Sequence, residues 1–244
     1  MQGCAESLEI FSEIKRMKTL MFAVISVFTF STMNNIIAQD WANLKKYELA
    51  NSKLSPPKTD EDRVVFMGNS ITEAWINVRP DFFKNNTYIN RGISGQTTPQ
   101  MLIRFKQDVV DLRPKVVVIL AGINDIAGNT GPSTIKMITD NIFSMAEIAK
   151  ANGIKVILCS VLPAADFPWQ PDINPGPKVN ELNKHLQAYS FTHNLVYVDY
   201  YSAMVDNRNG LRKELGEDSV HPNVAGYLIM EPIIAQGITK SLKK

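Results

Sequence analysis

Cysteine and histidine, two side chains that often bind metals, are rare in this chain of 244 residues, which has 2 cysteines and 3 histidines. Cys4 lies in a segment that we expect to be removed. Cys159 is then alone in an apolar strand, where a buried small side chain is expected rather than a nucleophile. A single cysteine forms no internal disulfide, and no Cys/His cluster has the spacing of metal ligands. We therefore expect no metal site and no cofactor.

An excess of charge of either sign is also missing. The 26 Lys and Arg residues nearly balance the 24 Asp and Glu residues, for a net charge of +2. Such a chain lacks the basic surface that nucleic-acid binding requires. Its hydrophobic fraction of 45% and charged fraction of 20% are typical of a globular protein. We expect one domain without internal repeats and without a nucleic-acid partner; the sequence leaves the oligomeric state open.

A hydrophobic run long enough to cross a membrane comfortably is absent near the N-terminus. The apolar run Leu20–Phe30 is shorter than the roughly 20 residues that a membrane span needs. Three basic residues precede it: Lys15, Arg16 and Lys18. A basic region, a short apolar run and small residues before a cleavage site after Ala38 or Gln39 are typical of a secretory signal peptide, whose true start could be Met17.

We therefore expect residues 1–39 to be an N-terminal extension and signal peptide. The protein is then secreted or periplasmic, with no stable membrane insertion after signal cleavage, and an uncleaved N-terminal anchor is the alternative. Residues 40–62 are expected to form a short amphipathic helix, which packs Trp41, Leu44 and Tyr47 on the domain, and a linker rich in helix breakers. Residues 63–244 would be the domain itself.

Within this domain, apolar strands alternate with helical patterns. Strands are expected at residues 63–68, 87–90, 115–122, 155–162 and 195–200. Three of them are continuous Val, Ile and Leu runs, which are typical of strands buried on both faces of a parallel sheet. Between strands the apolar spacing becomes helical, as at Ile135, Ile138 and Ile142. The alternation predicts an α/β fold, a flavodoxin-like three-layer α/β/α sandwich with a central parallel sheet of about five strands.

Ligand sites in such folds lie beyond the carboxyl ends of the strands. The segments that follow the predicted strands there are "GNS" (68–70), "NRGISGQTT" (90–98), "GIND" (122–125), the long loop 163–178 and "DSVHP" (218–222). Acyl transfer by a serine needs a base, an acid that orients the base, and hydrogen-bond donors for the oxyanion. Ser70 has the position of such a nucleophile, and the Asp-x-x-His turn lets one loop carry both Asp218 and His221.

The other strand ends offer the donors. Gly95 precedes a helix, where its missing Cβ lets a backbone N–H approach a ligand closely. Asn124 follows a buried strand, although a helix cap or an Asx-turn would explain it equally well if it stood alone. His185 and His193 lie in or just after a predicted helix, where a surface or capping role is expected.

Four ordered blocks resemble the SGNH hydrolases, also called the GDSL esterase/lipase family, and within it the platelet-activating-factor acetylhydrolase-like and carbohydrate-esterase branches. The blocks are "FMGNSITEAW", "NRGISGQTT", "VVVILAGINDIAG" and "DSVHPNVAGY", and the resemblance covers residues 63–240. It implies an esterase with Ser70 as nucleophile and Asp218 and His221 as the rest of a catalytic triad. It also implies an oxyanion hole formed by the N–H groups of Ser70 and Gly95 and by the Asn124 side chain.

One position departs from the family pattern, because Asn69 stands where the usual residue before the serine is aspartate. We expect altered local electrostatics rather than lost activity, and we take Asn69 as a candidate substrate contact. Trp169, in the proline-rich loop 163–178, is a second candidate because its ring could stack on a sugar, although ordinary loop packing would also explain it.

The resemblance implies ester hydrolysis, but the substrate must be argued from other features. No long amphipathic lid is visible, and the loop 163–178 is polar and rich in proline. These features favour a short-chain (acetyl) ester of a carbohydrate or a similar small molecule. A lysophospholipase or thioesterase is the alternative, and a catalytically silent binding module is a third hypothesis from another class.

Overall fold

The computed structural model of the protein describes residues 40–243. The extension and signal peptide expected over residues 1–39 therefore lie outside the described residues. In the described part of the chain, no helix is both long enough and apolar enough to span a membrane.

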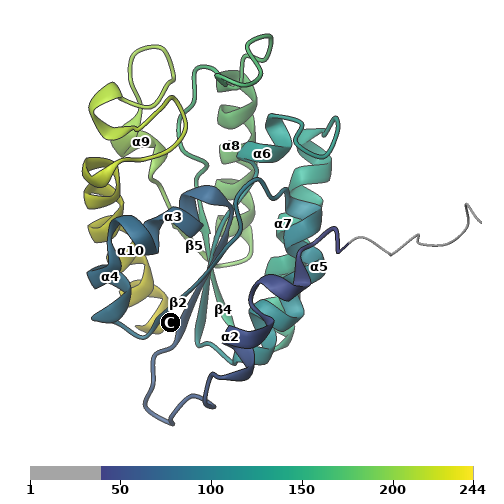
Figure 1. The fold of residues 1–244 in the computed structure, drawn as a ribbon, viewed down its shortest axis with the longest axis vertical. Helices are drawn as coiled ribbons and strands as arrows, with labels where there is room; N and C mark the ends of the chain where they lie inside the picture. Colours follow the sequence, from purple (N-terminus) through teal and green to yellow (C-terminus); the bar gives the residue numbers. More distant parts are fainter. Residues whose placement is uncertain (1–39, 244) are drawn as a thin grey trace, which may run out of the picture. The chain divides into compact units, whose positions relative to one another are not determined.

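Five parallel strands form the central sheet (Figure 1). They are β1 (Val64–Gly68), β2 (Tyr88–Gly92), β3 (Val116–Leu120), β4 (Lys155–Cys159) and β5 (Val196–Val198). Their order is β2-β1-β3-β4-β5, which is the flavodoxin-like order. The predicted fold class is confirmed, and each strand overlaps a run that the apolar pattern indicated.

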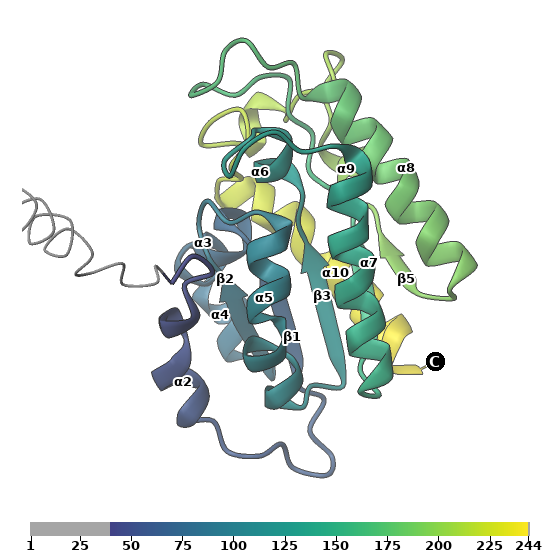
Figure 2. The ribbon, with the colours of Figure 1, turned by 90° about the vertical axis from the view of Figure 1, so that its right-hand side faces the viewer.

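Helices cover both faces of the sheet. They are α3 (Ser70–Val78), α4 (Pro80–Lys84), α5 (Thr98–Asp108), α6 (Ile123–Ile126), α7 (Ile135–Ala151), α8 (Gly176–Thr192), α9 (Tyr201–Met204) and α10 (Val224–Lys243), with short 3-10 turns at η2 (Val110–Leu112) and η3 (Lys213–Leu215). α3, α4 and α10 lie on one face, and α5, α7 and α8 lie on the other (Figures 1 and 2). The chain passes from β1 to β2 on one side, and then crosses back over β1 to β3, β4 and β5 on the other side. Because crossover connections are right-handed, this reversal of direction places the connecting helices on opposite faces of the sheet.

The core consists of the strands and the inward stripes of these helices. All residues of β1 and β3 are buried, which explains their unbroken apolar runs. Ile138 and Ile142 of α7 are each 1% exposed, as the helical spacing predicts. Cys159 is also 1% exposed, and burial raises the pKa of its thiol to about 12. The expectation of a buried cysteine is therefore confirmed, and a raised thiol pKa disfavours the thiolate.

The N-terminal segment of the described chain differs from the expected amphipathic helix. It forms a 3-10 helix, η1 (Leu44–Lys46), followed by a short α-helix, α2 (Glu48–Ser52), instead of one continuous helix. The prediction that Trp41 and Leu44 pack on the domain is wrong, because they are 45% and 36% exposed. The segment is held mainly by polar contacts, since the Tyr47 hydroxyl donates to the Gly92 carbonyl and the Gln96 amide donates to the Ala42 carbonyl at 2.7 Å.

The carboxyl ends of the central strands lie level with one another. Gly68 at the end of β1 pairs in register with Gly92 of β2 and Leu120 of β3. A Cβ on Gly92 would lie only 2.2 Å from the backbone nitrogen of Glu73 in α3, so glycine is needed for this close approach. The segments that follow the three strands therefore start from one edge of the sheet.

Candidate active site

Ser70 is the first residue of α3, directly after the turn that ends β1. Asn69 is the N-cap of this helix, and its side-chain oxygen accepts a hydrogen bond from the Ile71 N–H at 3.3 Å. Asn69 is 1% exposed, so it has no surface to offer a substrate. The expectation that Asn69 contacts substrate is corrected: its side chain caps the helix that carries Ser70.

The structure brings Ser70, His221 and Asp218 together. The Ser70 Oγ lies 2.9 Å from His221 Nε2, and His221 Nδ1 lies 2.9 Å from Asp218 Oδ2. An ionised carboxylate can only accept, so the ring proton belongs on Nδ1, and Nε2 then accepts from the serine hydroxyl. This arrangement can move a proton from the hydroxyl to the imidazole while the carboxylate holds the ring.

The turn 218–222 holds the carboxylate in place. The second carboxylate oxygen, Asp218 Oδ1, accepts hydrogen bonds from the backbone N–H groups of Val220 and His221, both at 2.7 Å. Partial burial would raise the pKa of Asp218, but these bonds and the bond from the His221 ring outweigh it and hold the pKa below its ordinary value. Asp218 is therefore favoured in the ionised form that can orient the imidazole.

Gly95 lies in the loop that connects β2 to α5. Its φ of +77° is in the left-handed region, and a Cβ built on it would meet no atom within 4 Å. Its backbone conformation, rather than close packing, therefore favours glycine. The loop is fixed on both sides of Gly95: the Ser94 N–H donates to the Glu73 carboxylate at 2.7 Å, and the Gly95 carbonyl accepts from the Asn129 amide at 3.1 Å.

Asn124 lies inside the short helix α6, which follows β3. Gly122 is the N-cap of this helix, so the capping alternative for Asn124 is set aside. Its side chain is buried, and Nδ2 donates to the Gln96 carbonyl at 2.9 Å. A side-chain amide has two N–H groups, so this bond leaves a second one that can donate.

Asp125 has a structural role that its sequence pattern does not reveal. Its carboxylate accepts from the Thr98 N–H at 3.0 Å and from the Thr98 hydroxyl at 2.6 Å. The side chain therefore ties α6 to the start of α5. Burial raises the pKa of Asp125 against the lowering effect of these hydrogen bonds. The signal available in the sequence was an aspartate after a buried strand, a pattern that also fits an ordinary turn.

Trp169 lies beside the imidazole. Its ring centroid is 6.2 Å from that of His221, and the ring also stacks on Phe167 at a centroid distance of 5.3 Å. Phe167 is fully buried, whereas Trp169 is 44% exposed. The indole is therefore held against Phe167 and remains partly exposed beside His221. His185 and His193 are exposed on and after α8, as expected, and His193 contacts the Tyr189 carbonyl at 3.0 Å.

The model of the GDSL-like lipase/acylhydrolase family matches residues 66–229. The chain belongs to this family. The match begins inside β1 and ends inside α10, so it includes all the strand ends described above. As a GDSL-like acylhydrolase, the protein is an esterase, and the family resemblance drawn from the four sequence blocks is confirmed.

Individual relatives show how far the similarity extends. A GDSL-like lipase from Bacteroides thetaiotaomicron is 51% identical, with a TM-score of 0.80 over 82% of this chain and 98% of that one. An acetylxylan esterase of Xylanibacter ruminicola is 24% identical over 86% of this chain and 48% of its own length. An uncharacterized lipoprotein of Bacillus subtilis is 36% identical over 37% of this chain and 39% of its own length. The chain thus spans less than half the length of these last two relatives.

Proposed function

We propose that this acylhydrolase is a secreted serine esterase that removes short acyl groups, acetyl above all, from carbohydrates. The supporting observation is the hydrogen-bonded chain from Ser70 through His221 to Asp218 at the carboxyl edge of the sheet. The oxyanion hole of this proposal consists of the N–H groups of Ser70 and Gly95 and the Asn124 amide.

The proposed reaction has two halves. The Ser70 oxygen attacks the ester carbonyl carbon while His221 Nε2 takes the hydroxyl proton, and the carbonyl oxygen becomes an oxyanion that the donors stabilise. When this intermediate collapses, the bond to the alcohol oxygen breaks, and His221 returns its proton to the leaving alcohol. Water then attacks the acyl-enzyme in the same way, which releases the acid and restores the serine.

The carbohydrate part of the proposal is supported by Trp169. An exposed indole beside the imidazole suits the apolar face of a sugar ring, and Phe167 behind it limits its motion. The loop around it carries polar side chains, Asp166 and Gln170, and ends in the proline-rich run before α8. The acetylxylan esterase among the relatives acts on an acetylated polysaccharide, as its name says.

Export is supported by the N-terminal sequence pattern and by the lipoprotein among the relatives. A protein placed outside the cytoplasm meets polysaccharides directly. No cofactor enters the proposed chemistry, because the nucleophile, base, acid and donors are all side chains and backbone groups of this chain.

The length of the preferred acyl chain tests this proposal. We expect kcat/KM on p-nitrophenyl esters to be highest for acetate or butyrate and flat or falling toward octanoate and palmitate. A long acyl groove would instead gain about 0.8 kcal/mol for each buried CH₂. Efficiency that rises steadily to eight or sixteen carbons would contradict the proposal and favour the lysophospholipase or thioesterase alternative.

Trp169→Ala separates sugar binding from general catalysis. We expect it to weaken hydrolysis of an acetylated xylooligosaccharide about tenfold and hydrolysis of p-nitrophenyl acetate much less, because only the first substrate has a ring to stack. The matched control is Phe191→Ala, which removes an aromatic ring that is 90% exposed on α8. An equal loss of activity on both substrates would show that Trp169 only packs within its loop and does not bind the sugar.

A further inference from the structure

α5 contains a buried ion pair that takes no direct part in the proposed ester hydrolysis. Arg104 and Asp108 are one helical turn apart, with side chains 0% and 1% exposed and a separation of 3.1 Å between Nη1 and Oδ2. A buried pair of this kind contributes little net stability, because desolvation of both charges offsets their attraction. Its contacts therefore need another explanation.

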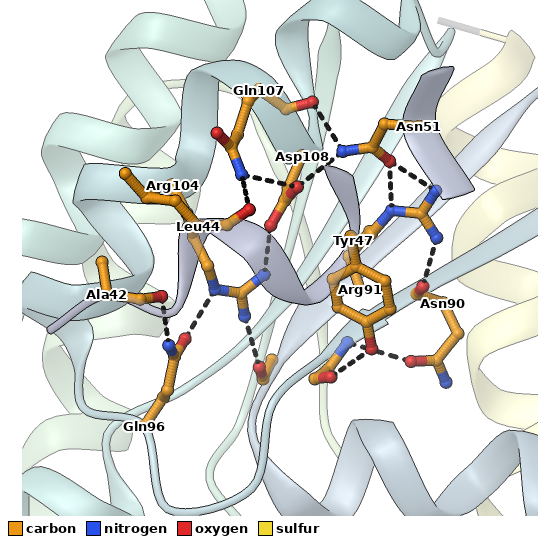
Figure 3. Close-up of polar contacts among 12 residues, drawn as sticks. Ala42, Leu44, Tyr47, Asn51, Asn90, Arg91, Gln96, Arg104, Gln107 and Asp108 are labelled. Carbon is orange, nitrogen blue, oxygen red and sulfur yellow. Dashed lines mark hydrogen bonds and ion pairs between the residues drawn. The ribbon is translucent and has the colours of Figure 1, made fainter. Parts of the chain in front are cut away.

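The remaining nitrogens of Arg104 point to two segments of the candidate active site (Figure 3). Nη2 donates to the Gly68 carbonyl at 3.0 Å, and Nε donates to the Gln96 side-chain oxygen at 2.5 Å. Gly68 is the last residue of β1 and lies two positions before Ser70, and Gln96 directly follows Gly95. The Arg104 guanidinium thus links the turn that carries Ser70 to the loop that carries Gly95.

Gln96 extends this connection to the third donor. Its backbone carbonyl accepts the hydrogen bond from Asn124 Nδ2 at 2.9 Å. Its side-chain amide donates to the Ala42 carbonyl at 2.7 Å. Both the backbone and the side chain of Gln96 are therefore fixed by hydrogen bonds. A shift of Gln96 would therefore move the Asn124 amide and the neighbouring peptide of Gly95 together.

Residues of the N-terminal segment, η1 and α2, also bond to this network. Asn51 donates through Nδ2 to Asp108 Oδ1 at 2.7 Å, and its oxygen accepts from Arg91 at 2.6 and 2.9 Å (Figure 3). The Arg91 guanidinium also lies 4.6 Å from the centre of the Tyr47 ring. Arg91 is 5% exposed and belongs to the same network, but its own hydrogen bonds go to Asn51 and the Asn90 carbonyl.

We propose that Arg104 is a positioning residue of the oxyanion hole: it holds the Ser70 turn and the Gln96 loop at one fixed separation and, through the Gln96 carbonyl, orients the Asn124 amide. This inference rests on the proposed function, which assigns the oxyanion donors. Arginine suits the task because its planar group directs several donors in fixed directions and stays charged when buried, whereas lysine has a single nitrogen. Small displacements of oxyanion donors reduce the rate rather than substrate binding.

The experiment compares Arg104→Lys with Arg91→Lys in the full chain, using p-nitrophenyl acetate. We expect Arg104→Lys to lower kcat at least tenfold with KM within twofold of the wild-type value. Arg91→Lys is the matched control for a buried arginine in the same network, and it should lower the melting temperature but leave kcat within twofold. Equal losses of kcat in both variants would overturn the proposal, as would a higher KM at unchanged kcat.

Combination with Asn124→Ala tests the route through the amide. If Arg104 acts through Asn124, Arg104→Lys should cost much less in the Asn124→Ala background, about threefold or less, because the donor that it orients is gone. A full tenfold loss in that background would overturn the proposed orientation of the Asn124 amide by Arg104 while leaving the oxyanion hole intact. Unchanged kcat in Asn124→Ala alone would overturn the assigned oxyanion hole and this inference with it.

A second variant keeps the test decisive if Arg104→Lys does not fold. Gln96→Met removes the side-chain bonds to Arg104 and Ala42 but keeps the carbonyl that accepts from Asn124. We expect the same pattern: kcat reduced at least fivefold, KM little changed, and much of the loss absent in the Asn124→Ala background. Wild-type kcat in a folded Gln96→Met protein would contradict the proposed positioning role.

Discussion

At the scale of single residues, the same amino-acid types have different roles according to what surrounds them. His221 lies between a serine hydroxyl and a carboxylate, whereas His193 ends α8 at the surface beside Tyr189. The sequence distinguished them through one feature, the aspartate three residues before His221. No comparable pattern marks Arg104, because its hydrogen-bond partners Gly68 and Gln96 lie at the end of β1 and in the loop before α5 and meet it only in the fold.

Asp218→Asn tests the orienting role of the carboxylate. The asparagine oxygen can still accept from the backbone of Val220 and His221, but its NH₂ group would face Nδ1 and favour the ring proton on Nε2. The ring could then no longer accept the Ser70 proton, so we expect kcat to fall about 10³–10⁴-fold with little change in KM. Steady-state kinetics on p-nitrophenyl acetate measures this.

The control for this substitution is Asp206→Asn. Asp206 also accepts backbone N–H bonds within its own turn, from Arg208 at 2.8 Å and Gly210 at 2.7 Å, but none of its hydrogen-bond partners is a histidine. Its variant should keep kcat near the wild-type value. Activity of Asp218→Asn above one tenth of the wild-type value would show that the carboxylate does not set the ring proton.

At the scale of elements, apolar patterns predicted the sheet and the long helices well. Strands β1 and β3 are fully buried, which accounts for their unbroken apolar runs, and α7 has one clear inward stripe. The segment 41–52 was predicted less well, because polar groups hold it: Tyr47 and Asn51 bond to partners in β2 and α5. A pattern of hydrophobicity carries no information about such contacts.

The N-cap of α3 provides a prediction at this scale. Asn69→Asp should retain the cap and activity close to that of the wild type, because a carboxylate accepts the Ile71 N–H as well as an amide oxygen does. Asn69→Ala should cost about 1 kcal/mol of stability and lower kcat, since α3 begins at Ser70. Urea unfolding and ester kinetics on both variants measure the two effects. Equal behaviour of the aspartate and alanine variants would contradict the capping role.

At the scale of the whole molecule, the predicted triad could be gathered from the sequence because the fold returns every strand to one edge. Ser70 follows β1, Gly95 follows β2 and Asn124 follows β3, while Asp218 and His221 come from the loop after β5. The sequence could not predict the side chains that surround these groups and hold them in place. The contacts of Arg104, Glu73 and Asp125 depend on which side chains meet across elements.

The N-terminal segment gives a prediction for the molecule as a whole. A chain that begins at Lys53 loses the contacts of Tyr47 and Asn51 to Arg91 and Asp108, and we expect its free energy of unfolding to drop by about 2 kcal/mol or more relative to a chain that begins at Asp40. Thermal unfolding of the two chains measures this. Leu49→Ala is the control, because Leu49 is 66% exposed in the same segment and its loss should change little. Equal melting temperatures of the two chains would contradict a structural role for the segment.

The central claim is that Ser70 is the nucleophile, and covalent labelling with a fluorophosphonate tests it most directly. Wild-type protein should be labelled stoichiometrically at Ser70, as mass spectrometry of the labelled peptide would show, with loss of esterase activity in step. Ser70→Ala should keep its fold, as judged by circular dichroism, and should show no labelling and less than a few per cent of wild-type turnover. Labelling of another residue, or substantial activity in a folded Ser70→Ala protein, would contradict the account.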